Sequence, residues 1–88
     1  MKIDKLIEEK RQDPEFNQYY LAEKDKLETA YALLEARENA GLTQTELAKK
    51  AHTTQSTIAR IERGDNVSFE KLQNIASALN KRLKVEFV

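Results

Sequence analysis

The sequence predicts an all-α fold of about five helices, followed by one short β-strand that pairs with another chain. Apolar residues recur at helical spacing, cap residues mark helix ends, and the apolar period changes to two after Asn80. The 88 residues suit one small domain. We divide it into an N-terminal helical extension (1–26), a central helical domain (27–80) and a C-terminal strand (81–88).

A long helix is predicted to begin at Asp13 and Pro14. Asp can cap the free amides of a first turn, and Pro at the first helical position gives up a donor that has no partner there. The run ends at Gly41, and its predicted apolar stripe is Phe16, Tyr20, Leu27, Tyr31 and Leu34. One helix or two collinear helices fit this run equally well. A continuous helix would be about 40 Å long, so its first half should protrude or bind a partner. The preceding residues show only a weak amphipathic pattern, formed by Ile3, Leu6 and Ile7.

Two short helices follow. Thr43 and Glu46 form a predicted capping box at the first, and Thr54 caps the second, which Gly64 ends. A turn is expected at residues 51–53. The predicted buried residues are Leu47, Ala48, Ala51, Ile58 and Ile61. The opposite face of the second helix carries Thr54, Gln55, Ser56, Ala59, Arg60 and Arg63.

The same helical rotation turns Glu62 inward, where an unpaired carboxylate would cost several kcal/mol. Arg37 is predicted to share a buried stripe of the preceding helix with Leu27, Ala30 and Leu34. We therefore predict an Arg37–Glu62 ion pair between the two helices.

A last helix is predicted to begin at Ser68 and to bury Phe69, Leu72, Ile75, Ala76 and Leu79. After it, Leu83, Val85 and Phe87 alternate with Arg82, Lys84 and Glu86, which is typical of a half-buried strand. The sequence offers no second strand, so this one must pair with another copy of the chain or with a different protein.

The composition excludes several classes of function. A formal net charge of zero argues against coating nucleic acid by bulk attraction. The absence of cysteine, of a long apolar stretch and of a leader predicts a cytoplasmic protein with no membrane contact. We expect no enzyme, no catalytic residue, no cofactor and no metal site, because no nucleophile–base pair, phosphate loop or ligand cluster is recognisable. The single His52 is expected to be structural or to face solvent, because no Cys or second His is present to join it in a metal site.

Two short helices joined by a tight turn form a DNA-reading unit, and residues 44–64 have that pattern. The predicted base contacts are Thr54, Gln55, Ser56 and Arg60, and the predicted phosphate contacts are Thr43, Gln44 and Asn66. A homodimer on an inverted-repeat operator of double-stranded DNA is expected. The predicted partner interface is Phe16, Tyr19, Tyr20, Leu83, Val85 and Phe87, although the N-terminal rings could instead enlarge the core.

The stretch Arg37 to Leu79 resembles the repressor-type helix-turn-helix family of lambdoid phage repressors and Xre-like regulators. Gln44 opens the first helix of the motif, Ala48 is its small residue, and Ile58 and Ile61 are its buried anchors. Arg37 and Glu62 match the buried ion pair of that family. The chain departs from the pattern at His52, where the family usually has Gly because the turn needs a positive φ.

The whole chain is also similar to HigA-like antitoxins, through Asp13 to Phe16 and Lys81 to Phe87. This resemblance implies a RelE- or HigB-like mRNA-cleaving toxin as partner and repression of the chain's own operon. Two alternatives remain open. The chain could be an orphan or prophage repressor without a toxin, or an interaction protein that does not bind DNA.

Overall fold

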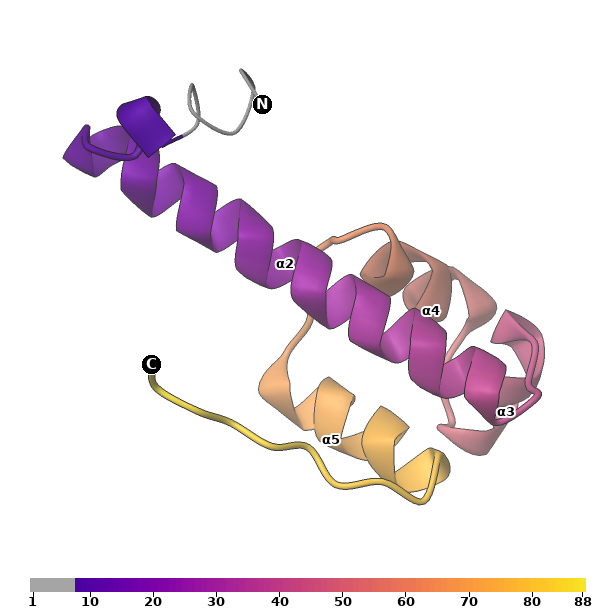
Figure 1. The fold of residues 1–88 in the computed structure, drawn as a ribbon. Helices are drawn as coiled ribbons and strands as arrows, with labels where there is room; N and C mark the ends of the chain where they lie inside the picture. The colour runs from indigo at the N-terminus through magenta and orange to yellow at the C-terminus, as the bar shows by residue number, and fades with distance from the viewer. Residues whose placement is uncertain (1–7) are drawn as a thin grey trace.

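The computed structural model describes residues 8–88, and every element in that range is a helix (Figure 1). A short helical stretch at residues 8–10 precedes α2 (Pro14–Asn39), α3 (Gln44–Lys50), α4 (Gln55–Glu62) and α5 (Phe69–Ala78). The all-helical prediction is therefore confirmed for this range. The weak pattern of Ile3, Leu6 and Ile7 lies outside the described residues.

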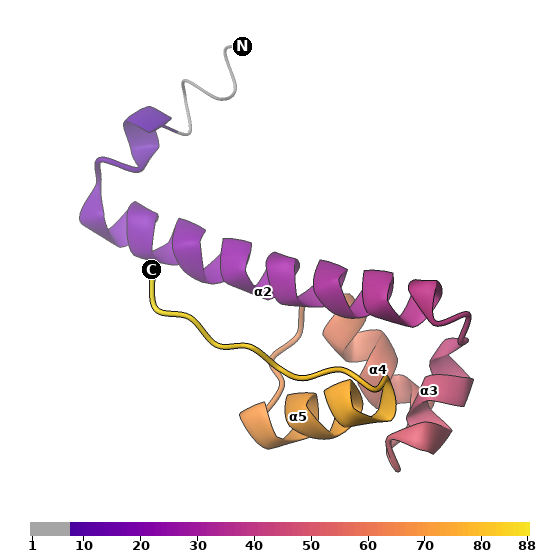
Figure 2. The same ribbon diagram turned by 60° about the horizontal axis from the view of Figure 1, so that its bottom comes forward.

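Helix α2 is one continuous helix of 26 residues that serves as the scaffold. The shorter helices gather at its C-terminal half, while its N-terminal half extends beyond them in both views (Figures 1 and 2). Helix α4 packs against α2 and α3, and α5 packs against α3. The molecule is therefore elongated, with principal extents of 44 × 25 × 20 Å.

Helices α2 to α5 each begin at a predicted cap. Backbone N–H groups donate to the side-chain oxygens of these caps over 3.0 to 3.2 Å, and the donor–cap pairs are Glu15–Asp13, Glu46–Thr43, Thr57–Thr54 and Lys71–Ser68. The capping box is complete, because the Thr43 backbone N–H also donates to the Glu46 carboxylate at 2.9 Å. These bonds satisfy amides that would otherwise lack a partner in the first turn.

All four helices end on a residue in the left-handed region. The φ values are 71° at Gly41, 55° at His52, 95° at Gly64 and 57° at Asn80. In each case the following residue donates its backbone N–H back to a carbonyl in the last turn, as Thr53 does to Ala48 at 2.9 Å. His52 therefore adopts the conformation for which its position normally requires glycine.

The core lies where α3, α4 and α5 meet the C-terminal half of α2. Its buried residues are Leu33, Leu47, Ala48, Ala51, Ile58, Ile61 and Ile75, with Leu42, Val67, Ala78 and Leu79 packed around them. Phe69 was expected in this core but is 53% exposed, because it is the first residue of α5 and lies at the edge of the bundle.

The buried face of α2 differs from the predicted stripe. Leu27 and Tyr31 are 62% and 64% exposed, whereas Ala30 and Leu33 are buried. Leu34 is only half-buried. Two apolar stripes run along α2: Leu27 and Tyr31 lie on one, and Ala30 and Leu33 lie on the other. Helix α4 packs on the second stripe, and this orientation of α2 also turns the Arg37 guanidinium toward Glu62.

Residues 81–88 follow α5 without forming a strand, and no strand is present within residues 8–88. A strand is defined by backbone hydrogen bonds to a neighbour, and the described part of the single chain offers none to this tail. The predicted pairing with another chain is thus not seen in the single copy. No helix among the described residues is long and apolar enough to cross a membrane.

Candidate nucleic-acid interface

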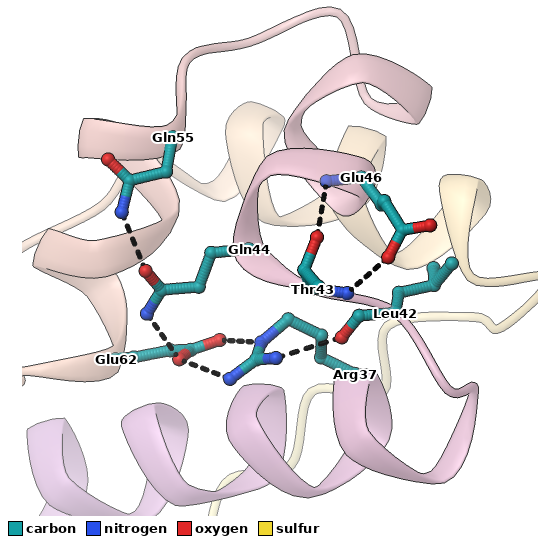
Figure 3. A network of polar contacts seen from close by, with 7 residues as sticks. All are labelled: Arg37, Leu42, Thr43, Gln44, Glu46, Gln55 and Glu62. Carbon is teal, nitrogen blue, oxygen red and sulfur yellow. Dashed lines mark hydrogen bonds and ion pairs between the residues drawn. The ribbon is translucent and has the colours of Figure 1, made fainter.

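The predicted ion pair is present and joins α2 to α4 (Figure 3). Arg37 donates through Nε to Glu62 Oε2 at 2.7 Å and through Nη2 to Glu62 Oε1 at 3.1 Å. Its Nη1 donates to the carbonyl of Leu42 at 2.8 Å, in the link between α2 and α3. The two side chains are only 14% and 6% exposed, so these bonds compensate charges that water barely reaches.

The pair alters the acidity of both groups. Burial alone raises the pKa of the Glu62 carboxyl, but hydrogen bonds from Arg37 and Gln44, together with the charge of Arg37, bring this pKa below its usual value. The hydrogen bond to Glu62 raises the pKa of Arg37, against the opposing effect of burial. Both groups are therefore charged at neutral pH.

Gln44 extends this network to α4. Its Nε2 donates to Glu62 Oε1 at 3.0 Å, and its Oε1 accepts from Nε2 of Gln55 at 2.7 Å. The side chain thus connects the ion pair to the first residue of α4 (Figure 3). From the sequence, Gln44 was expected to open the first helix of the motif and to contact phosphate. Its bond to Gln55 was not predicted, because no local pattern reveals a bond to a residue of the next helix.

The face of α4 opposite the core is exposed. Thr54, Gln55, Ser56 and Arg60 are all exposed, whereas Ile58 and Ile61 on the inner face are 0% and 2% exposed. Thr54 Oγ1 already accepts from Thr57 N and lies 2.9 Å from Thr57 Oγ1, so its hydroxyl is partly committed to the cap. The two isoleucines fix the rotation of this helix and hence the direction of its polar face.

The two longest predicted base-contact side chains are available for binding. The amide oxygen of Gln55 points away from Gln44, and only one of its two amide hydrogens is needed for that bond (Figure 3). Among residues 8–88, no carboxylate lies within ion-pair distance of Arg60. Arg63 has a neighbour in Asp65, but their atoms are 3.8 Å apart and largely exposed, a weak contact.

The predicted phosphate contacts differ in their surroundings. Thr43 and Glu46 use each other in the capping box, which lowers the pKa of Glu46 through the backbone and side-chain hydrogen bonds of Thr43. Gln44 is half-buried in the polar network. Asn66 is exposed and lines a groove with Arg60 and Lys71.

Lys71 is a residue that sequence reasoning missed. It lies on α5, lines the groove beside Arg60, and donates through Nζ to Thr53 Oγ1 at 3.3 Å. Its position next to α4 depends on how α5 packs, so the local sequence gives no signal for it. The groove gains a second positive charge from Lys71.

The three N-terminal aromatic rings of the predicted partner interface lie on the protruding half of α2. Phe16 and Tyr20 stack with centroids 6.3 Å apart, and the Arg11 guanidinium lies 4.9 Å from the Tyr20 centroid. Tyr19 is 66% exposed. None of these rings belongs to the hydrophobic core cluster among the described residues. In the tail, Leu83 is half-buried, while Val85 and Phe87 are exposed.

A comparison with known protein families finds a match. The family model described as Helix-turn-helix matches residues 33–85, which is more than half of the chain and includes α3, α4 and α5. A comparison with curated proteins finds no match. No three His, Cys, Asp or Glu side chains within residues 8–88 are grouped so that they could hold a metal ion.

Proposed function

Since the chain belongs to the helix-turn-helix family of DNA-binding domains, we propose that it represses transcription by binding an inverted-repeat operator as a dimer, with no catalytic activity. The observation that carries this proposal is the exposed face of α4, free of carboxylates and fixed by buried isoleucines and the Arg37–Glu62–Gln44–Gln55 network. A rigid polar helix face suits the major groove, because base contacts need fixed directions.

Gln55 suits adenine. With one amide hydrogen held by Gln44, its Oε1 can accept from adenine N6 while the other amide hydrogen is donated to N7. The bond to Gln44 thus orients the Gln55 amide and leaves its oxygen and its second hydrogen free to contact a base. Thr54 and Ser56 lie beside it at the start of α4 and are proposed to contact base edges.

Arg60 suits guanine, whose O6 and N7 accept a guanidinium bidentately. Each good pair of this kind contributes about 1 to 3 kcal/mol of discrimination. Thr43, Gln44 and Asn66 are proposed to contact phosphates, with Lys71 beside Asn66 adding charge.

The test is a binding selection with the full chain and randomised duplexes. Arg60→Ala should relax the preference at one position of each half-site, and Arg60→Lys should fail to restore it because lysine lacks the bidentate fork. Arg11→Ala, which removes the same charge on the protruding segment, serves as the control. Equal weakening on all sequences would mean that Arg60 contacts only phosphate.

We further propose that the chain is an antitoxin whose protruding α2 half binds a RelE- or HigB-like toxin. The resemblance of Asp13–Phe16 and Lys81–Phe87 to HigA-like antitoxins supports this, as do the uncovered rings of Tyr19 and its neighbours.

Co-expression with the protein encoded by the adjacent reading frame tests this proposal. We expect the chain to rescue growth and to co-purify with that protein, and Tyr19→Ala with Tyr20→Ala to reduce both effects. Operator binding without any toxic neighbour would instead favour the orphan repressor. Absence of specific DNA binding with partner binding retained would favour a pure interaction protein.

A further inference from the structure

The C-terminal tail, residues 82–88, has a backbone without partners. It runs beside α5 in both ribbon views (Figures 1 and 2). Within residues 8–88, none of its N–H or carbonyl groups bonds to another backbone group, and the last such donor is Lys81. An extended segment with unpaired backbone groups can accept a second strand along its edge.

The two faces of the tail differ in character. Lys84 Nζ and Glu86 Oε1 are 2.8 Å apart, so these two side chains lie on the same side. By the alternation of an extended chain, Leu83, Val85 and Phe87 share the other side. Leu83 lines a groove of about 410 Å³ between α2 and α5 and is half-buried there. Val85 and Phe87 are 57% and 101% exposed, which leaves an apolar edge uncovered.

We propose that the tail pairs antiparallel with the tail of a second copy of this chain, in the register that sets the two Val85 residues opposite each other. In this register each Lys84 faces Glu86 of the other copy, and each Leu83 faces Phe87. Opposite charges and apolar side chains that lie directly across an antiparallel pair stabilise it. Phe87 of each copy then covers Leu83 of the other at the edge of the α2–α5 groove.

Competing registers each contain an unfavourable pair. A two-fold axis at Lys84 opposes Arg82 to Glu86 and Leu83 to Val85, but it sets two lysines opposite each other at its centre. An axis at Glu86 sets two glutamates opposite each other. An axis at Leu83 opposes Arg82 and Lys84, and an axis between Lys84 and Val85 opposes Leu83 and Glu86. Because the Val85 register opposes unlike charges and apolar side chains without any like-charge pair, a second copy is the occupant that the sequence of the tail favours over an unrelated strand.

This inference deepens the proposed function, because a symmetrical operator needs a symmetrical dimer. It is tested without DNA, so its failure and that of operator binding are separate results. The chain has no native cysteine, which makes disulfide cross-linking specific. Directly opposed residues have Cα atoms about 4.5 to 5.5 Å apart, within the range of a disulfide.

Val85→Cys in the full chain should form a covalent dimer on mild oxidation. Lys84→Cys and Glu86→Cys, which have no copy of themselves opposite, should remain monomeric on a non-reducing gel. Cross-linking that is strongest at position 84 or 86 would overturn the register, and no cross-linking at position 85 would overturn the pairing.

Charge reversal gives an independent test by sedimentation equilibrium. Lys84→Glu or Glu86→Lys alone should raise the dimer dissociation constant about tenfold, because two attractive pairs become repulsive. The double variant Lys84→Glu with Glu86→Lys restores the opposite charges and should restore the dimer. Circular dichroism should stay unchanged, since both side chains are exposed. A wild-type chain that stays monomeric, or a double variant that fails to recover, would refute the inference.

Discussion

At the scale of single residues, four side chains connect the interior to the candidate reading face. Arg37 neutralises Glu62, Glu62 holds Gln44, and Gln44 holds Gln55. The direction of an exposed amide on α4 therefore depends on a largely buried ion pair between α2 and α4. Such a chain of hydrogen bonds restricts the rotamers of Gln55 before any duplex is bound, which reduces the entropy lost on binding.

His52 carries conformational strain that can be removed. With φ at 55° it occupies a left-handed position that costs a non-glycine residue about 1 kcal/mol. Glycine has a larger conformational entropy in the unfolded chain, which offsets part of this gain. His52→Gly should therefore raise the melting temperature by less than about 4 °C in thermal unfolding followed by circular dichroism. Asn80→Gly is the matched control at φ 57°, and it should gain less because asparagine tolerates this region. An unchanged or lower melting temperature for His52→Gly would show that the turn is not strained.

The lowered pKa of Glu62 predicts loss of stability in acid. A carboxyl whose pKa is lower in the folded state stabilises the fold above its unfolded pKa, and this contribution disappears as pH falls through the folded value. Urea unfolding should therefore show stability falling below about pH 4.3. Glu62→Gln should lose part of that dependence, and Glu46→Gln should lose the part due to the capping box. An identical pH profile for both variants and the wild type would contradict this.

At the scale of helices, Arg37 joins three segments of the fold. Its guanidinium binds the α4 carboxylate and the carbonyl of Leu42, so α2, α4 and the α2–α3 link are held at one point. The short helices α3 and α4, with 7 and 8 residues, are too short to be stable alone. Their geometry must come from this contact and from the apolar core.

A double-mutant cycle measures the contact between α2 and α4. Arg37→Met should destabilise the chain by about 3 to 5 kcal/mol, because it leaves Glu62 buried with Gln44 as its remaining side-chain partner. Adding Glu62→Leu should recover much of that loss, since no unpaired charge is then buried. The free energies of unfolding are measured by chemical denaturation. If the losses of the two single variants add up to the loss of the double variant, the two side chains act independently.

At the scale of the whole molecule, folding and binding surfaces are spatially separate. The core uses the C-terminal half of α2. The other half extends beyond the bundle (Figure 2) and carries Phe16, Tyr19 and Tyr20. The formal net charge is zero, yet α2 is acidic and the groove beside α4 carries Arg60 and Lys71. Uneven charge of this kind can direct different partners to different ends of one small protein.

This separation predicts how stability responds to substitution. Changing Phe16, Tyr19 and Tyr20 together to alanine should shift the melting temperature by less than about 4 °C, as expected for residues outside the core. Leu33→Ala, in the buried half of the same helix, should cost about 2 to 5 kcal/mol. A large loss of stability in the aromatic variant would mean that the rings complete the core.

The sequence by itself determined the features that depend on residues close together in the chain. The caps at Asp13, Thr43, Thr54 and Ser68 follow from side chains that reach amides two or three residues away. The ion pair was also predictable, because helical rotation turned Glu62 inward and a buried carboxylate needs a cation.

Only the tertiary structure decided which stripe of α2 is buried, because two apolar stripes are available and packing against α4 selects one of them. The link from Gln44 to Gln55 and the place of Lys71 beside Arg60 were hidden for the same reason. Each joins residues of different helices, and their approach depends on packing angles that no local pattern encodes.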